Sequence, residues 1–451
     1  MSNFIKLMEA STIIIGSGIS GLTIASGMKH DNFLILEARD RIGGRVYTND
    51  KYLDMGAAWI HGSDKNPLNK FLDYEKLIPV SENNPWMHSE NTPIKYFCNK
   101  HNITDDERQR LTEKWNIIAA KIGNIKDKTI VEAFLSLWDN DKDEDYFIFL
   151  YMIEVWCGGS VKNIPSSFLN TTNYKEALFG DYGGSHFLFK NGTKTLVDSI
   201  VNNSNYSYYD KIQYNKIVTN VNYNDNFVEV HTNDGCVYVC NKLCITVPPG
   251  PLKNIIFNPP LKKDRIDSLS KIKFGSYKKI QLEFSKDNIF WENENVPMFL
   301  IYNSDLNGRD YYLNNCDDTK EMYPYMLWNN YNYSKQKPIL EAICPANIGW
   351  KLSGKSDEEI VEIAMTNLRN YYPNAPDPIS WQIARWEEDI FSQGSYSYHD
   401  LNTTDEDIRI ISENIENTIF FAGEHTDPIY YGSLHAAYNS GMRVLSELFK
   451  E

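Results

Sequence analysis

The sequence has no apolar run near the ~18 residues that a membrane-spanning helix needs. Its first residues, MSNFIKLMEAS, lack the apolar core and small-residue cleavage site of a secretory signal. Its last residues, LFKE, do not form a peroxisomal tripeptide. Cysteines are few, seven in 451 residues, odd in number and scattered, which fits a reducing compartment. We therefore expect a cytoplasmic protein with no membrane segment.

Signals for metal and nucleic acid binding are also missing. Cys236, Cys240 and Cys244 recur every fourth residue, but they fall in an alternating strand pattern without a histidine or cysteine pair at zinc spacing. We therefore expect no metal. The net charge of −15 argues against a nucleic acid partner. An acidic field would concentrate polycations near the protein, although acidity that only maintains solubility explains the charge equally well.

The chain has enough apolar residues for a large core, 42 % of the total. Its most informative segment is a β-α-β unit near the N-terminus. A β-branched run over residues 12–15 predicts a strand, residues 33–36 predict a second strand, and an apolar pattern of helical period lies between them. Three glycines with G-x-G-x-x-G spacing stand where the first strand meets the helix: Gly16, Gly18 and Gly21.

Each glycine has a physical reason in a nucleotide site. Gly16 allows the tight turn from strand to helix, Gly18 lets the backbone approach a pyrophosphate, and Gly21 lets helix and strand pack closely. The helix N-terminus offers free N–H groups to the phosphates. Glu37 ends the second strand, where a carboxylate can bind both hydroxyls of an adenosine ribose. The unit predicts nucleotide binding, with a glycine-rich turn in an ordinary α/β unit as the alternative.

The continuation RDRIGGR, residues 39–45, favours FAD over NAD. A second glycine pair, ending in Gly44, would bring another backbone turn to the pyrophosphate, and the guanidinium of Arg45 can pair with phosphate oxygens. This extension resembles the FAD-dependent amine oxidase superfamily, which includes polyamine oxidases, monoamine oxidases and lysine-specific histone demethylases. The resemblance implies bound FAD and adds Arg39 to the residues expected to contact it.

The pattern of elements and the resemblance together predict an α/β fold (α+β overall) with two domains. A Rossmann-like FAD-binding domain would be discontinuous, made of residues 1–75, 186–262 and 385–451. Residues 76–185 and 263–384 would form a substrate domain of mixed sheet plus helices. Further predicted elements are helices over residues 103–122, 130–156 and 356–371, the last capped by Ser356 and Glu359, and strands over 211–223, 237–247, 273–284, 298–302 and 326–330.

The C-terminal block IFFAGEHTDPIYYGSLHAAYNSGMR, residues 419–443, resembles the second FAD signature of this family. The resemblance places Glu424 at the middle of the cofactor and Ser433 and Leu434 beside the flavin ring. A helix that starts near Ser433 would direct its N-terminal dipole at the ring end where negative charge gathers on reduction. The alternative is a buried strand, turn and helix with an incidental glutamate.

The segment FGSYKKIQLEFSKDNIFW, residues 274–291, resembles the lysine strand of the family. The resemblance places Lys279 where it holds a water against flavin N5 and assists reoxidation by oxygen. A lysine buried there has a cost unless it is hydrogen-bonded or partly neutral. We interpret the neighbouring Lys278 as a solvent-exposed strand residue.

The segment IARWEEDIFSQGSYSY, residues 383–398, resembles the family segment that approaches the flavin. Trp386 would flank the cofactor, and Tyr396 would be the aromatic wall that attracts and orients an amine. Ser395 stands where monoamine oxidases have the cysteine that is bonded to flavin, so we expect noncovalent FAD. Ser433 stands where monoamine oxidases have a second tyrosine, so we expect a half-open cage.

The motif GAAWIHG, residues 56–62, resembles polyamine oxidases, whose signature has W-I-H-G or W-L-H-G at this place. His61 would hydrogen-bond a substrate amine or take its proton; alone, a loop histidine is more often a surface or capping residue. The resemblance also implies that Ala58 and Trp59 line the flavin and that the backbone of Val218 contacts adenine. Two other histidines are interpreted as structural, His186 and His435.

The resemblance implies a polyamine oxidase that acts on spermine, spermidine or N-acetylated polyamines. Hydride would pass from the carbon next to a neutral nitrogen to flavin N5, the imine would hydrolyse to aldehyde and amine, and O₂ would become H₂O₂. We expect a monomer or weak homodimer. A histone-demethylase-like enzyme, an L-amino-acid oxidase and a non-catalytic FAD-binding protein remain alternatives. Carboxylates that line a tunnel for a cationic substrate cannot be ranked among Glu82, Glu90, Glu154 and Glu388.

Overall fold

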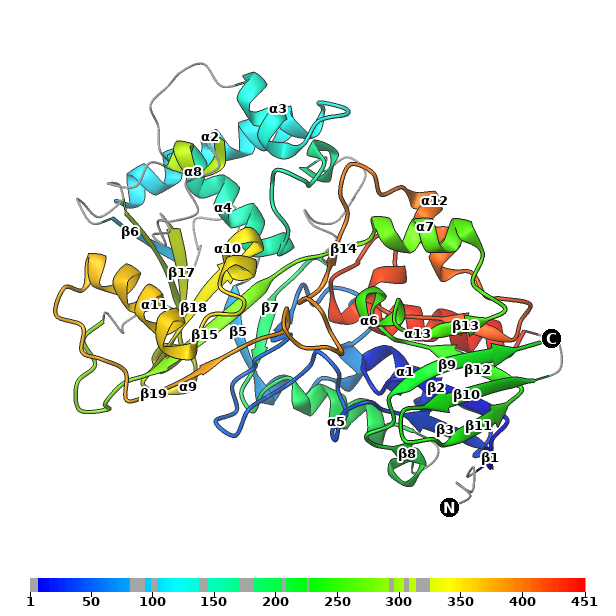
Figure 1. Cartoon of the computed structure of the whole chain (residues 1–451). Coiled ribbons are helices and arrows are strands. Elements are labelled where there is room, and N and C mark those ends of the chain that lie inside the picture. Colours follow the sequence, from blue (N-terminus) through cyan, green and yellow to red (C-terminus); the bar gives the residue numbers. More distant parts are fainter. Residues whose placement is uncertain are drawn as a thin grey trace.

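The computed structural model describes residues 7–81, 94–98, 104–137, 145–169, 182–204, 208–224, 227–291, 296–303, 308–313 and 325–450. The chain forms two lobes (Figure 1). One contains both ends of the chain, and the other contains most of the cyan and yellow middle segments. Of the expected tunnel carboxylates, Glu82 and Glu90 lie outside the described residues.

A five-stranded parallel sheet forms the centre of the first lobe, and this confirms the predicted Rossmann-like α/β arrangement. Its strands are apolar and mostly buried, as expected where helices cover both faces. The strand order is β21 (Ile419–Phe421), β12 (Lys242–Ile245), β2 (Thr12–Ile15), β3 (Phe33–Leu36) and β8 (Ile212–Gln213). Segments from the beginning, middle and end of the chain therefore meet in one sheet, while the predicted domain boundaries themselves stay a prediction.

Two helices pack together beside this sheet. α1 (Ile19–Ser26) follows β2 directly, and α13 (Leu434–Leu448) follows the C-terminal strand. The Oγ of Ser20 donates to the carbonyl oxygen of Ala437 at 2.9 Å, and a Cβ added to Gly441 would lie 2.8 Å from the Ser20 carbonyl oxygen. The N-terminal ends of both helices therefore lie near the carboxyl ends of the parallel strands. α5 (Lys194–Asn202) also contacts α1.

A second five-stranded sheet adjoins the first. Its order is β1 (Leu7–Glu9), β11 (Val237–Cys240), β10 (Val228–Thr232), β9 (Val218–Tyr223) and β13 (Ile256–Asn258). The sequence predicted single strands over residues 211–223 and 237–247, but each is divided. Asn215 has a positive φ of 57° between β8 and β9, and the chain passes at Asn241 from β11 into the parallel sheet. Each predicted strand was wrong in length because its halves belong to different sheets.

Short helices flank these sheets. The segment VPPGPL, residues 247–252, contains the one-turn helix α6 (Pro249–Leu252), which begins with proline at its first position. The others on this lobe are α7 (Lys263–Lys271) and α12 (Asp405–Ser412). Single 3₁₀ turns occur at Asn69–Phe71, Tyr74–Lys76, Ser166–Leu169, Tyr209–Lys211 and Glu424–Thr426.

The second lobe is a six-stranded mixed sheet covered by helices. The order is β19 (Ser380–Ile383), β15 (Tyr277–Glu283), β18 (Ile339–Pro345), β17 (Tyr325–Asn330), β16 (Met298–Tyr302) and β6 (Ile94–Cys98). All neighbours are antiparallel except β16 and β6. The helices are α2 (Asp105–Gly123), α3 (Ile130–Leu137), α4 (Asp145–Cys157), α8 (Gly308–Leu313), α9 (Tyr331–Lys335), α10 (Ala346–Lys351) and α11 (Asp357–Tyr371).

The residues at the N-terminus of α11 predicted where this helix begins. Ser356 accepts a hydrogen bond from the backbone N–H of Glu359, and the Glu359 side chain accepts one from the Ser356 N–H, which confirms the predicted capping box. The helix expected over residues 130–156 is two helices, α3 and α4, with residues 138–144 between them outside the described part.

Two small sheets connect the lobes. One has the order β4 (Trp59–Ile60), β7 (His186–Phe189) and β5 (Leu77–Ser81), and the other pairs β14 (Lys273–Phe274) with β20 (Ser397–Tyr398). β4 ends directly before His61 and β20 begins directly after Tyr396, two residues that the sequence assigned to the substrate site. In the part of the chain that the structure describes, every helix is too short or too polar to cross a bilayer.

Candidate active site

A cavity of about 440 Å³ extends from the parallel sheet to the six-stranded sheet. Segments from both lobes line it. Sixteen of the predicted site residues border it: Gly16, Gly18, Glu37, Arg39, Gly44, Arg45, Ala58, Trp59, His61, Val218, Lys279, Trp386, Tyr396, Glu424, Ser433 and Leu434. Gly21 lies behind the lining, where an added Cβ would meet the carbonyl oxygen of Gly16 at 2.0 Å. Residues far apart in the sequence are therefore brought to one cavity.

The glycine turn has the shape that a pyrophosphate requires. Gly16 has a φ of +99°, and a Cβ added to Gly18 would have no heavy atom within 4 Å, so this position opens onto the cavity. Gly44 approaches the Gly18 backbone so closely that its added Cβ would lie 3.2 Å from the Gly18 Cα. The first turn of α1 has no side-chain cap, which leaves its N–H groups to a ligand. The turn therefore fits the phosphates of FAD.

Glu37 is held at the carboxyl end of β3. One carboxylate oxygen accepts from the N–H and Oγ of Ser17 at 2.7 and 2.6 Å, and the other accepts from the Arg39 N–H at 2.8 Å. A carboxylate has about four lone-pair sites, so it retains capacity for a ribose hydroxyl. Ser17 was not singled out from the sequence, because a serine between two glycines carries no signal of its own.

The two predicted cofactor arginines have carboxylate partners. Arg45 Nη1 lies 2.9 Å from Glu424 Oε1 and donates to the Ser395 carbonyl oxygen at 3.0 Å. The guanidinium of Arg39 donates to both oxygens of Asp389, at 2.6 and 2.9 Å. Both Arg45 contacts use one nitrogen, so the rest of its fork can face a phosphate, whereas both terminal nitrogens of Arg39 are engaged.

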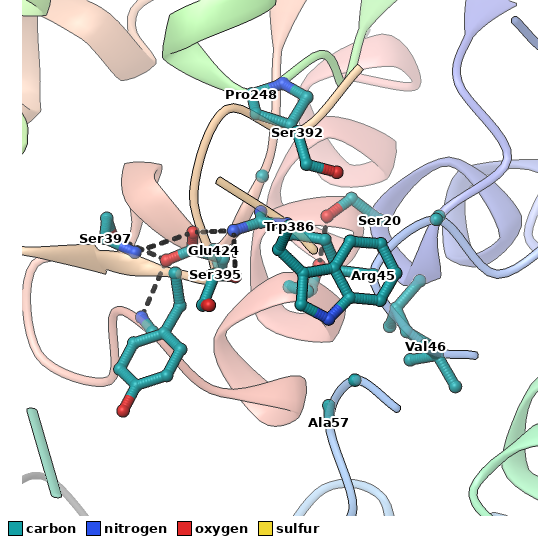
Figure 2. A pocket seen from close by; sticks show the side chains of 18 of the residues that line it. Ser20, Arg45, Val46, Ala57, Pro248, Trp386, Ser392, Ser395, Ser397 and Glu424 are labelled. Atoms are coloured by element: carbon teal, nitrogen blue, oxygen red, sulfur yellow. Dashed lines mark hydrogen bonds and ion pairs between the residues drawn. The ribbon is translucent and has the colours of Figure 1, made fainter. Parts of the chain in front are cut away.

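Glu424 is buried at the centre of a hydrogen-bond network. Figure 2 shows its carboxylate facing Arg45 and Ser397. It accepts from the Oγ of Ser397 at 2.5 Å and from the N–H of Gly432 at 2.7 Å. Burial alone would raise the pKa of Glu424, but the Arg45 charge and the hydrogen bonds outweigh burial and lower this pKa. The carboxylate is therefore ionised and tied to the segment that carries Tyr396.

Lys279 reaches the cavity from β15 and is hydrogen-bonded to the turn of residues 54–56. Its Nζ donates to the carbonyl oxygens of Asp54 and Gly56, each at 2.8 Å. An ammonium has three donors, so one remains for a water in the cavity. Lys279 is 3 % exposed, and these carbonyls satisfy the expectation that a buried lysine here must be hydrogen-bonded.

The interpretation of Lys278 as solvent-exposed was wrong. Its side chain is fully buried, and its Nζ lies 3.0 Å from Glu387 Oε2. β15 lies between β18 and β19, and both of its faces are covered. In such a strand alternation no longer separates a buried face from an exposed one, so the sequence pattern could not show this burial.

Tyr396 lines the cavity and is fixed by its hydroxyl, which donates to the carbonyl oxygen of Trp156 at 3.0 Å. Burial raises the pKa of Tyr396 well above its ordinary value, so the phenol stays neutral. Tyr277 contacts it with 6.1 Å between ring centroids. Trp156 and Tyr277 also line the cavity but were not predicted. Only the position of Tyr277, two residues before Lys279 and so on the same strand face, could have indicated it.

Ser433, at the expected second wall of the cage, is used as the N-cap of α13. Its Oγ accepts from the N–H of Ala436 at 3.0 Å and donates to the carbonyl oxygen of Tyr430 at 2.6 Å. The helix therefore starts at Leu434, beside the cavity, as the sequence predicted. Its N-terminal dipole is available to a ligand there.

His61 lies among aromatic rings. The ring centroids of Trp156 and His186 are 5.0 and 5.6 Å from that of His61, and Trp59 is stacked at 6.0 Å. Burial, followed by the neighbouring His186 and His435, holds the pKa of His61 well below its ordinary value. The imidazole is therefore neutral near pH 7 and can accept a hydrogen bond. His186 and His435 are both buried behind the lining.

The remaining expected tunnel carboxylates do not border the cavity. Glu154 accepts from the Val161 N–H at 3.1 Å inside the second lobe, where burial raises its pKa to about 7. Glu388 pairs with Arg385 at 2.9 Å. Among the described residues, the carboxylates that line the cavity are Glu37 and Glu424.

The cysteines with four-residue spacing follow the strand pattern. Cys240 ends β11 and Cys244 lies in β12, and both are buried. Within the described ranges, no group of three or more His, Cys, Asp and Glu side chains is placed to hold a metal ion.

Comparisons with known proteins agree with this geometry. The sequence matches the family of flavin-containing amine oxidoreductases over residues 19–444. It is 27 % identical over 466 residues to polyamine oxidase 4 of Oryza sativa subsp. japonica, with 98 % of this chain and 88 % of that protein covered. It is 26 % identical over 508 residues to lysine-specific histone demethylase 1 homolog 3 of Arabidopsis thaliana, with 96 % of this chain and 30 % of that protein covered.

The fold is similar to that of a solved putrescine oxidase bound to putrescine. The TM-score is 0.72 at 16 % sequence identity, with 98 % of this chain and 99 % of that chain covered. The family match spans nearly the whole chain and both halves of the cavity. The protein belongs to the flavin-containing amine oxidoreductase family and is an FAD-dependent amine oxidase.

Proposed function

We propose that this amine oxidase is a polyamine oxidase whose substrates are spermine, spermidine or their N-acetylated forms. The observation that carries the proposal is the neutral, half-buried imidazole of His61 in the aromatic wall of the cavity that also contains Lys279 and Tyr396. The similarity to polyamine oxidase 4 and the acidic net charge of −15 support it.

The cofactor is assigned to the end of the cavity near the parallel sheet. Glu37 would bind the ribose, Val218 the adenine, and the α1 N-terminus the phosphates together with Arg45. Arg39 would contribute by holding the neighbouring loop through Asp389. The remaining cofactor contacts are assigned to Gly16, Gly18, Gly44, Ala58, Trp59, Trp386, Glu424, Ser433 and Leu434, while Gly21 would act through the close packing of α1 on Gly16.

Bound FAD supplies a hydride acceptor for the carbon next to the substrate nitrogen. His61 would accept a hydrogen bond from the substrate amine, because its imidazole is neutral and its lowered pKa makes it a weak proton acceptor. The face of Tyr396 would attract and orient the cationic part of the substrate. Lys279 would hold a water through its third N–H donor. The aromatic lining would exclude other water from the reacting atoms.

Three finer assignments belong to the same proposal. Ser395 offers a hydroxyl where a covalent flavin bond would need a thiol, and its Oγ accepts from the Tyr277 N–H at 2.8 Å, so FAD would be noncovalent. Oxygen would be the second substrate and hydrogen peroxide a product. A cytoplasmic location and a monomer or weak homodimer stay predictions.

The cavity offers little to an amino-acid oxidase, which would need an arginine for the substrate carboxylate near the flavin. The arginines that line the described part of the cavity are Arg39 and Arg45. Both lie beside the dinucleotide turn and are paired with Asp389 and Glu424. We therefore prefer an amine without a carboxylate as the substrate.

Anaerobic reduction tests the proposal directly. Purified enzyme is mixed without oxygen with spermine, spermidine, N-acetylated polyamines, benzylamine or leucine, and the bleaching of the flavin absorption is followed. We expect rapid bleaching with at least one polyamine and slow or no bleaching with leucine. If no polyamine bleaches the flavin, the proposed substrate class is wrong, whereas bleaching by benzylamine alone would indicate a monoamine oxidase.

A further inference from the structure

Two adjacent lysines on β15 point in opposite directions. Lys279 lines the cavity, whereas Lys278 is 0 % exposed on the other side of the strand. The Nζ of Lys278 lies 3.0 Å from Glu387 Oε2 and donates to the Ala384 carbonyl oxygen at 3.4 Å. A second carboxylate, that of Glu388, lies 3.6 Å away. A buried ammonium needs such partners, so Lys278 fixes the segment that contains them.

Glu387 is attached to the same strand at a second point. Its Oε1 accepts a short hydrogen bond from the Oγ of Ser276. The N–H of Ala384 donates to the Lys279 carbonyl oxygen at 2.9 Å. Residues 384–387 are therefore joined to residues 276–279 by backbone and by side chains on the face away from the cavity.

The residue before Glu387 is Trp386, which faces the cavity. Its Nε1 donates to the Met55 carbonyl oxygen at 2.8 Å. Lys279 binds the carbonyl oxygens on either side of Met55, those of Asp54 and Gly56. The Lys278–Glu387 ion pair lies on the face of β15 away from the cavity, and the turn of residues 54–56 binds Trp386 and Lys279 on the cavity side. Trp386 and Lys279 are therefore fixed from both sides.

We propose that Lys278 and Glu387 are positioning residues, a buried ion pair that fixes the Trp386 indole and the Lys279 ammonium against the turn of residues 54–56. The inference rests on the proposed role of Lys279 and deepens it. A buried ion pair is a poor source of stability compared with apolar residues of the same volume. Because the pair lies directly behind Trp386 and Lys279, we assign it the role of keeping these two side chains in position. Small displacements of groups in an active site reduce reaction rates strongly.

The double variant Lys278→Met/Glu387→Leu tests this use without leaving a buried charge unpaired. The purified variant, reduced anaerobically with dithionite, is mixed with O₂, and flavin reoxidation is followed by stopped flow. We expect full FAD occupancy, a melting temperature close to that of the wild type, shifted flavin absorption bands and reoxidation slower by about tenfold or more. Reoxidation within about twofold of the wild type with unchanged bands would overturn the proposal.

Reoxidation needs no amine, so a failure of the polyamine assignment does not affect this test. If Lys279→Met reoxidises at the wild-type rate, the proposed role of Lys279 fails, and the positioning pair is then judged by the flavin absorption bands alone. Lys278→Arg keeps the charge and is expected to retain most of the wild-type rate. If the pair only stabilises the fold, the reoxidation rate and the flavin absorption bands should change in each variant in proportion to the change in melting temperature.

Arg265→Met is the matched control. Arg265 is a buried cation of α7 that donates to the carbonyl oxygens of Ile411 and Glu413 and does not line the cavity. Its removal is expected to lower the melting temperature and leave reoxidation unchanged. Should the double variant fail to fold, Ser276→Ala removes one hydrogen bond of Glu387. We expect reoxidation about threefold slower in that variant, and an unchanged rate and spectrum would contradict the proposal.

Discussion

Lys279 and Trp386 are bound to the same turn, by three consecutive carbonyl groups. The Nζ of Lys279 donates to the carbonyl oxygens of Asp54 and Gly56, and the Nε1 of Trp386 donates to the carbonyl oxygen of Met55. All three hydrogen bonds are 2.8 Å long. Two side chains from distant segments are thus held by one short piece of backbone. Because all three carbonyls are used, a displacement of either side chain leaves a buried acceptor unpaired.

We predict that Lys279→Met binds FAD but turns over slowly. Methionine keeps most of the volume and removes the ammonium that would hold a water in the cavity. The expected loss is about 100-fold in the rate of flavin reduction or reoxidation, measured by stopped flow, with the flavin content of the purified protein unchanged. Wild-type rates in both half-reactions would remove the assigned role.

We predict that His61→Phe keeps the cavity shape and loses a hydrogen-bond acceptor for the substrate amine. Phenylalanine retains the stacking with Trp59 and the contact with Trp156, while the neutral imidazole is removed. We expect kcat/KM for the best polyamine to fall by about tenfold, and the acid limb of the pH profile that belongs to this residue to disappear. His231→Gln is the control, because His231 is a partly exposed histidine of β10 outside the cavity. This substitution should leave the pH profile unchanged. An unaltered profile in His61→Phe would show that the imidazole takes no part.

The sequence predicted the fold and the cavity best where backbone geometry itself demands a residue type. Gly16 and Gly44 could be recognised because a positive φ disfavours other side chains there, and Gly18 because a side chain at this position would enter the space of the ligand. The capping box at Ser356 was recognised because its two residues are only three positions apart in the sequence. Its formation does not require contacts with distant segments.

Sequence reasoning was least effective where partners come from distant segments. Lys278 is buried against residues 384–388, and its partner Glu387 lies more than a hundred residues away in the sequence. The engagement of Arg39 by Asp389 has the same origin. Tyr277 and Trp156 resemble ordinary core residues, since an aromatic side chain has the same pattern whether it packs on protein or on a ligand.

We predict that Glu424→Gln destabilises both the fold and the bound cofactor. The amide leaves Arg45 without its charged partner in a largely buried place, which costs about 3 kcal/mol of unfolding free energy. Chemical denaturation with and without added FAD measures it. Lys263→Met, which removes an exposed pair with Asp267, should have almost no effect. An equal effect of the two substitutions would contradict the central place given to Glu424.

We predict that His399→Phe makes the fold less sensitive to acid. Burial lowers the pKa of His399 to about 4 from its ordinary 6.5, so below pH 6.5 the unfolded chain binds a proton that the folded chain refuses. This contribution to stability is full above pH 6.5 and is lost progressively as the pH falls to 4. Phenylalanine retains the stacking on Tyr431 and does not titrate. Melting temperatures from pH 7 to pH 4 should therefore fall less steeply in the variant, and parallel curves would show that His399 does not contribute.

We predict that acid releases all of the flavin. Ser395 replaces the thiol that a covalent bond to the flavin would need, and its Oγ is occupied by the Tyr277 N–H. FAD would then be retained only by hydrogen bonds, charges and the shape of the cavity, which unfolding destroys together. Precipitation with trichloroacetic acid should leave a colourless pellet and a yellow supernatant, and the absorbance of the supernatant should equal that of the enzyme before precipitation. Yellow colour that stays in the pellet after washing would require a covalent attachment at another residue, and peptide mapping would then locate it.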